Sequence, residues 1–105
     1  MVSESPAGTQ RGGHAHRRCH QVLISATGSV RVEFDDDDGT HVLELDNPTR
    51  GLDIPPLVWA KQTYVSEGAS LVVLASLPYD VEDYIDDRYE AARLRKMVNG
   101  PLAAE

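Results

Sequence analysis

The chain has 105 residues, of which 17 are acidic and 10 are basic, so its formal net charge at pH 7 is −7. This length fits one domain, and the acidic balance argues against nonspecific nucleic-acid binding, which needs a basic surface. No apolar run is long enough to span a membrane, the first ten residues lack the apolar region of a secretory signal, and the single cysteine, Cys19, excludes an internal disulfide. We therefore expect a cytoplasmic protein with no nucleic-acid or membrane partner.

Most of the chain has the pattern of short strands. The first ten residues are small and polar, which predicts a disordered tail over 1–10. Beyond them, β-rich segments alternate with turn residues, and Asp38-Gly39 is a strong hairpin signal. The predicted strands cover 21–27, 29–34, 40–45, 52–54, 58–65 and 70–76. The last of these is continuously apolar, which is typical of a strand buried on both faces. Such spacing favours a small antiparallel barrel or jelly roll over 11–79.

The end of the chain changes to helical periodicity. Asp80 can cap the N-terminus of a helix, with Asp83 in the third position as in a capping box. Gly100-Pro101 is a stop signal. Hydrophobic and aromatic residues between them recur at helical spacing, namely Val81, Tyr84, Ile85, Tyr89 and Ala92. We predict one helix over 80–99, packed on or beside the barrel.

The basic residues of this acidic chain are concentrated near its start. No acidic residue lies between Glu4 and Glu33, whereas three of the four histidines do. The same interval contains Arg11, Arg17, Arg18 and Arg31. A solvated surface explains this clustering as well as an anionic ligand does, although arginine suits phosphate geometry.

The pair His14 and His16 is the main chemical feature. Side chains two residues apart lie on the same face of a strand, so on a strand both imidazoles would enter the same space. In a loop they would be two surface histidines, and the pair alone favours neither reading.

The residues around the pair resemble the cupins. Gly12-Gly13-His14-Ala15-His16, followed by Gln21 and Gly28, is similar to the first cupin motif, in which a His-x-His pair precedes a Glu and a Gly. The segment from Gly51 to Pro55 resembles the opening of the second motif. The resemblance implies an all-β fold, a small cupin-type antiparallel barrel or jelly roll, here with one C-terminal helix.

The metal ligands of that family are incomplete in this chain. Metal-binding cupins use both histidines, the Glu and a further His in the second motif, but here Gln21 replaces the Glu and 58–61 contains no His. Because a catalytic metal site normally has at least three protein ligands, we predict no metal and two histidines free to exchange protons. A metal-dependent oxygenase or isomerase is the less favoured alternative.

A narrower resemblance begins at the same residues. Arg11-Gly12-Gly13-His14-Ala15-His16-Arg17 is similar to the Arg-Gly-x-His-Ala-His-Arg motif of the nucleotide-sugar 3,4-ketoisomerases, and the similarity continues in order over roughly 11–87. These metal-independent cupins act on dTDP-4-keto-6-deoxyglucose. The resemblance implies a homodimer without a cofactor that moves the keto group from C4 to C3 through an enediol, as part of deoxyamino-sugar biosynthesis.

The resemblance also suggests roles for individual residues. His14 and His16 would be the acid–base pair, and Arg11 would face the substrate or its diphosphate. Gln21 would bind a sugar hydroxyl or orient a histidine, which requires a turn or bulge near Arg18 because its strand parity differs from that of His16. The remaining substrate-binding candidates are Arg17, which could equally be a surface charge, and Trp59, which could equally be a core residue.

The chain departs from this family at its start. Family members normally have further strands and an active-site tyrosine ahead of the Arg-Gly motif, whereas only ten residues precede Arg11 here. We therefore expect the N-terminal strands to be lacking. The alternative function is a truncated, catalytically impaired cupin that binds a nucleotide sugar or another anion without turnover.

Overall fold

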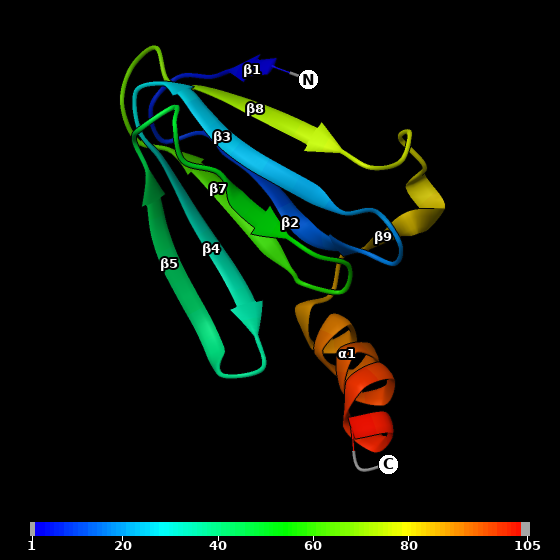
Figure 1. The fold of residues 1–105 in the computed structure, drawn as a ribbon. Helices are drawn as coiled ribbons and strands as arrows, with labels where there is room; N and C mark the ends of the chain where they lie inside the picture. Colours follow the sequence, from blue (N-terminus) through cyan, green and yellow to red (C-terminus); the bar gives the residue numbers. More distant parts are fainter. Residues whose placement is uncertain (1, 104–105) are drawn as a thin grey trace.

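The computed structural model describes residues 2–103, which form two antiparallel sheets and one long helix (Figure 1). The four-stranded sheet has the order β1 (Val2–Glu4), β8 (Ser70–Ala75), β3 (Gln21–Thr27) and β6 (Leu52–Ile54). The five-stranded sheet has the order β5 (Gly39–Leu45), β4 (Val30–Asp36), β7 (Ala60–Tyr64), β2 (Gln10–His16) and β9 (Tyr84–Ile85). The all-β fold with one C-terminal helix is thus confirmed, although the strands form two separate sheets rather than a closed barrel.

The core lies between the two sheets and follows the alternation in the sequence. In β4, Val30 and Val32 are fully buried whereas Arg31 is exposed. They pack with apolar residues of both sheets, including Leu23, Leu45, Ile54, Tyr64 and Leu71. The predicted turn at Asp38-Gly39 does connect a hairpin, because β4 and β5 pair along their whole length. The expectation that 70–76 is buried on both faces is wrong, since Leu74 is 53% exposed.

The first residues do not form a disordered tail. Val2–Glu4 form β1, which pairs with β8 from Val2 opposite Val72 to Glu4 opposite Ser70, and Gln10 already belongs to β2. Strand pairing uses main-chain groups, so a segment with small polar side chains can still cover the edge of an apolar strand. Composition alone therefore gave the wrong prediction for this segment.

The C-terminal helix begins later than its periodicity predicts. Asp80 does accept a hydrogen bond from the Glu82 N–H, but it caps only a short 3₁₀ helix, η1 (Val81–Asp83). Tyr84 and Ile85 then form β9, which pairs with the end of β2. The helix α1 spans Arg88–Ala103. Main-chain pairing with the open edge of β2 thus takes precedence over the helical spacing of the side chains.

Two arginines attach α1 to the five-stranded sheet. Arg88 donates hydrogen bonds to Asp35 and Glu33 of β4. Arg95, although charged, is only 8% exposed. It donates to the Asp37 carboxylate and to two main-chain carbonyls, those of Asp36 and Leu57.

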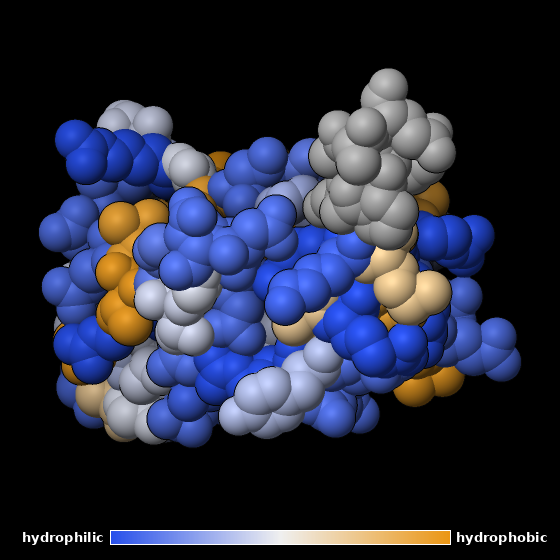
Figure 2. All heavy atoms as spheres, turned by 90° about the horizontal axis from the view of Figure 1, so that it is seen from below, coloured by the Kyte–Doolittle hydropathy of each residue, from blue (hydrophilic) through white to orange (hydrophobic). Residues whose placement is uncertain are grey.

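The helix projects from the end of the molecule opposite the N-terminus (Figure 1). Seen from that end, the surface is largely hydrophilic, with apolar residues in separate spots rather than one continuous area (Figure 2). None of the described helices combines the length and the apolar character needed to cross a membrane.

Candidate active site

The end of β2 carries both histidines into the space between the sheets. The register of β2 against β7 shifts between Gly12 and His14, and Gly12 and Gly13 have φ angles of +79° and +80° that glycine adopts readily. After the shift β2 pairs with β9, so that His16 lies opposite Tyr84. The ring centroids of His14 and His16 are 5.1 Å apart, with an interplanar angle of 79°.

Both imidazoles face a cavity of about 570 Å³ between the two sheets. Its inner walls are mainly apolar, with Leu23, Ile54, Leu71 and Val73 among the lining residues. Polar groups on the wall include Arg11, Gln21 and Gln62. A mostly apolar pocket with a few convergent polar groups is typical of a small-molecule site.

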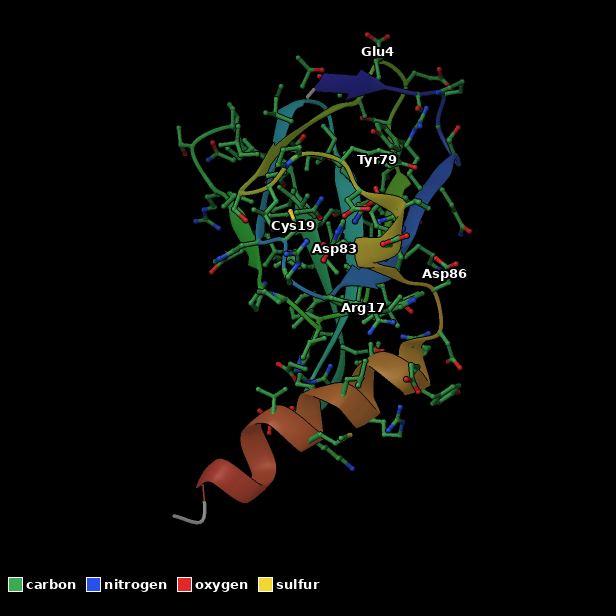
Figure 3. All side chains as sticks on the ribbon, turned by 90° about the vertical axis from the view of Figure 1, so that its right-hand side faces the viewer. Glu4, Arg17, Cys19, Tyr79, Asp83 and Asp86 are labelled. Atoms are coloured by element: carbon green, nitrogen blue, oxygen red, sulfur yellow. The ribbon has the colours of Figure 1, made fainter. Side chains whose placement is uncertain are left out.

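The buried carboxylate of Asp83 contacts the His16 ring. Asp83 is 6% exposed, and its Oδ2 lies 3.2 Å from His16 Nδ1. The main-chain N–H of Arg18 donates to Asp83 Oδ1 at 2.8 Å, and that of Cys19 donates to Oδ2 at 3.1 Å. Figure 3 shows Cys19 and Asp83 close together in the middle of the molecule. The other ring nitrogen, His16 Nε2, is buried with no hydrogen-bond partner among the described residues.

Aromatic rings complete the surroundings of the histidines. Tyr84 stacks on His14, with ring centroids 4.2 Å apart and an interplanar angle of 15°, and meets His16 edge-on at 4.7 Å. Tyr79 meets Tyr84 edge-on at 5.6 Å and is itself 79% exposed at the cavity. These rings restrict the orientations open to both imidazoles.

The protonation states follow from burial and neighbouring groups. Burial lowers the pKa of His14, and a positive charge on His16 would lower it further, so His14 is neutral at pH 7. Burial alone would raise the pKa of Asp83, but the hydrogen bonds from Cys19, Arg18 and His16 together lower it, so this carboxylate is ionised. Burial raises the pKa of Tyr84, which keeps its phenol protonated.

His16, Cys19 and Asp83 are the described residues closest to a metal-ligand set, since one ligand atom from each lies within 4.8 Å of the others. The donor chemistry fits a metal poorly. Both Asp83 oxygens already accept main-chain hydrogen bonds, and the Cys19 thiol contacts the carbonyls of His20 and Leu77. Coordination by the thiolate would set its negative charge against those two carbonyl oxygens.

The substrate-binding candidates from the sequence divide into two groups. Arg11 and Gln21 line the cavity, and residues 17–20 supply the bend that Gln21 needs to face inward. Arg17 has an exposed side chain outside the cavity lining, and only its main-chain N–H reaches the site, where it donates to the Asp83 carbonyl.

Trp59 also lies outside the cavity lining. It is 8% exposed and belongs to a second small core with Ala15, Ile85 and Ala91. Its Nε1 donates to the Asp86 carbonyl at 3.1 Å, and the Arg88 guanidinium lies 4.1 Å from its ring centroid. These contacts make Trp59 a part of the attachment of α1 to the sheet.

Asp83, Tyr84 and Cys19 also lie at the site, although sequence patterns did not predict them there. Asp83 was interpreted as part of a helix cap, and Tyr84 as one position of an apolar helical stripe. The one available signal was that the ketoisomerase resemblance continues through this segment. Local spacing carries no information about a contact that joins residues 67 positions apart.

The chain is similar to known proteins both in sequence and in structure. The family described as "FdtA: WxcM-like, C-terminal" matches residues 1–96. A curated relative, TDP-4-oxo-6-deoxy-alpha-D-glucose-3,4-oxoisomerase of Aneurinibacillus thermoaerophilus, is 43% identical over 75 residues, which are 71% of this chain and 54% of that protein. The chain thus spans about half the length of this relative.

Solved structures of similar proteins cover a larger share of this chain than the curated relative does. The crystal structure of QdtA, a sugar 3,4-ketoisomerase from Thermoanaerobacterium thermosaccharolyticum in complex with TDP, has a TM-score of 0.82 and 37% identity, over 92% of this chain and 73% of that chain. WlaRA, a TDP-fucose-3,4-ketoisomerase from Campylobacter jejuni, has a TM-score of 0.83 and 27% identity, over 90% of this chain and 70% of that chain.

Proposed function

Because the chain belongs to the FdtA (WxcM-like, C-terminal) family, we propose that it is a sugar-nucleotide 3,4-ketoisomerase acting on dTDP-4-keto-6-deoxyglucose or a similar nucleotide sugar. The observation that carries the proposal is the pair of imidazoles, 5.1 Å apart, that open onto one cavity. The relatives named as TDP-sugar ketoisomerases support the substrate class.

The reaction needs proton transfers and no net oxidant. A base removes the proton at C3, the electrons of that C–H bond form the C3–C4 double bond, and the C4 oxygen takes up a proton to give the enediol. A proton is then delivered to C4 while the hydroxyl at C3 loses its proton and becomes the new carbonyl. Two adjacent imidazoles can divide these transfers, and positioned acid–base groups each contribute about 10²–10⁴-fold.

The protonation and hydrogen bonding of the two histidines suit this division of the proton transfers. His14 is neutral at pH 7 because burial lowers its pKa, so it can accept the carbon-bound proton. The Nδ1 atom of His16 contacts the Asp83 carboxylate, whereas Nε2 has no partner among the described residues and would interact with a substrate oxygen. Arg11 would bind the diphosphate and Gln21 a sugar hydroxyl, since both line the cavity. We assign Arg17 and Trp59 no substrate contact.

The proposal is tested by incubating the protein with dTDP-4-keto-6-deoxyglucose and following the sugar by NMR. We expect the 3-keto product from the wild type, and losses of at least about 100-fold in His14→Asn and His16→Asn. His20→Asn and His41→Asn are matched controls, because these histidines pair with Asp53 and Asp36 outside the cavity lining. Ligand-dependent thermal stabilisation without product would instead support binding without turnover.

The proposal includes a metal-independent reaction. Extensive dialysis against EDTA should leave the turnover rate unchanged, because the proton transfers use side chains of the chain itself. Loss of activity that Zn²⁺ or Mn²⁺ restores would favour the metal-dependent alternative.

We further propose a homodimer in the cytoplasm. The edge strand β5 supports the dimer, since Val42 and Leu43 are 61% and 43% exposed there. The free, buried Cys19 is compatible with a reducing compartment. Analytical ultracentrifugation of the purified chain at micromolar concentration tests the dimer, and a monomer there would exclude it.

A further inference from the structure

The buried carboxylate behind His16 has no role in the proton transfers described above. We propose that Asp83 is a positioning residue, which fixes His16 in the tautomer that carries its lone pair at Nε2 and stabilises the imidazolium when His16 takes up a proton. This inference rests on the proposed function, because it assigns His16 a task that only a proton-transfer reaction requires.

The position of Asp83 is fixed from three sides. Its carboxylate accepts the N–H of Arg18 at 2.8 Å and the N–H of Cys19 at 3.1 Å, so the turn after β2 holds both oxygens. Its own main-chain carbonyl accepts the N–H of Arg17 at 2.7 Å. Rotation of the carboxylate away from His16 would break the hydrogen bonds to Arg18 and Cys19.

The charge of Asp83 determines which nitrogen of His16 carries the proton. An ionised carboxylate only accepts hydrogen bonds, so His16 Nδ1, 3.2 Å away, must be the donor. A neutral imidazole protonated at Nδ1 has its lone pair at Nε2. That atom is buried and has no hydrogen-bond partner among the described residues, so no described group competes with a substrate for it.

The groups around His16 leave Asp83 as its only close ionised carboxylate partner among the described residues. From β2 it meets the His14 ring, and from β9 the protonated Tyr84 ring. The Cys19 thiol lies on the turn after β2. The guanidinium of Arg18 lies 3.8 Å from Asp83 on an exposed side chain. An imidazolium at His16 would therefore be stabilised mainly by Asp83.

The test replaces the carboxylate by its neutral isostere. In Asp83→Asn one carboxylate oxygen becomes an NH₂ donor, which at the Oδ2 position would turn His16 Nδ1 into an acceptor and place the proton on Nε2. For a catalytic triad the same replacement lowers kcat about 10⁴-fold through the wrong tautomer. We expect kcat to fall at least about 100-fold while KM changes by less than about threefold.

A spectroscopic readout and a control variant separate positioning from folding. The ¹⁵N shifts of His16 in the substrate-free protein report the tautomer directly, and we expect protonation at Nδ1 in the wild type and its loss in Asp83→Asn. Asp53→Asn is the matched control, because Asp53 contacts His20 on the surface. It should keep both kcat and the His16 spectrum.

The outcomes distinguish this inference from the proposed function. A wild-type His16 protonated at Nε2, or an Asp83→Asn variant with wild-type kcat, would overturn the positioning role. If Asp83→Asn does not fold, the wild-type ¹⁵N shifts still decide the tautomer. If the wild type yields no product, the proposed function fails, whereas the tautomer measurement stands on its own.

Discussion

The attachment of α1 to the sheet allows a quantitative prediction for Arg88→Met. Arg88 donates to both oxygens of Asp35, at 3.0 and 2.7 Å, and to Glu33 at 3.0 Å. Asp35 is 9% exposed, and without Arg88 it would keep Thr40 as its remaining side-chain hydrogen-bond donor. The substitution removes the charge and preserves much of the aliphatic length that packs near Trp59.

The expected cost follows from how deeply the pair is buried. Removing one partner of a fully buried ion pair costs about 3–5 kcal/mol. The Arg88 and Glu33 side chains are 30% and 28% exposed, so solvent screens part of the interaction. We expect a loss of about 2–3 kcal/mol in the free energy of unfolding. For a domain of this size that loss lowers Tm by roughly 10–20 °C.

The difference between wild type and variant should also depend on pH. The hydrogen bond from Arg88 is the main reason that the pKa of Asp35 lies below its ordinary value of 3.8. A lowered carboxyl pKa contributes stability that is present above the ordinary value and is lost as pH falls through the lowered one. The two unfolding curves should therefore lie furthest apart above about pH 4 and converge in more acidic buffer.

Urea unfolding followed by circular dichroism measures these changes. Arg93→Met is the control on the same helix, because Arg93 pairs with Glu90 on the exposed surface, and its Tm should stay close to that of the wild type. Adding Asp35→Leu to Arg88→Met should restore part of the lost stability, since the buried charge of Asp35 is then no longer left without Arg88. A loss below about 1 kcal/mol for Arg88→Met, or purely additive effects in the double variant, would refute the reasoning.

Three further predictions concern the site and its scaffold. Trp59→Phe loses the hydrogen bond to Asp86 and should cost about 1–2 kcal/mol in chemical unfolding with an unchanged KM; a tenfold rise in KM at unchanged stability would return Trp59 to the substrate site. Because burial lowers the pKa of His14, the acidic fall in kcat/KM should lie below pH 6.5, and a fall centred at or above that value contradicts a neutral His14. Gly12→Ala should cost about 1–3 kcal/mol from its positive φ, and more because the added Cβ would lie 2.6 Å from Gln62 Oε1 and 3.1 Å from the main-chain carbonyl oxygen of Ala60. Gly8→Ala is the control, because Gly8 also has a positive φ but a Cβ added there would have no atom within 4 Å. Equal losses in the two variants would show that the contacts with Gln62 and Ala60 cost nothing.

Short-range rules predicted the parts of the site that depend on one strand and one turn. Strand parity places His14 and His16 on the same side, and in the structure both imidazoles face one cavity. Gln21 has the opposite parity and required a bend near Arg18, which residues 17–20 provide. Both inferences need only the geometry of a few consecutive residues.

The contacts made by the segment after β8 could not be predicted in the same way. Tyr84 and Ile85 satisfy helical spacing as well as they satisfy a two-residue strand, and only the neighbouring edge of β2 decides between them. Asp83 reaches His16 because this pairing brings the segment across the site. Strand β1 is similar, since its pairing with β8 depends on main-chain groups that polar composition does not reveal.

The pairing of β2 also has a consequence for biosynthesis. Both neighbours of this strand, β7 and β9, are encoded far downstream, so a growing chain exposes the unpaired edges of β2 before either partner has been translated. Non-local pairing of this kind slows folding and lengthens the exposure of aggregation-prone intermediates. The strand that carries the histidines therefore keeps an unpaired edge until most of the chain has been made, and the site assembles only when residues 83–85 have left the ribosome.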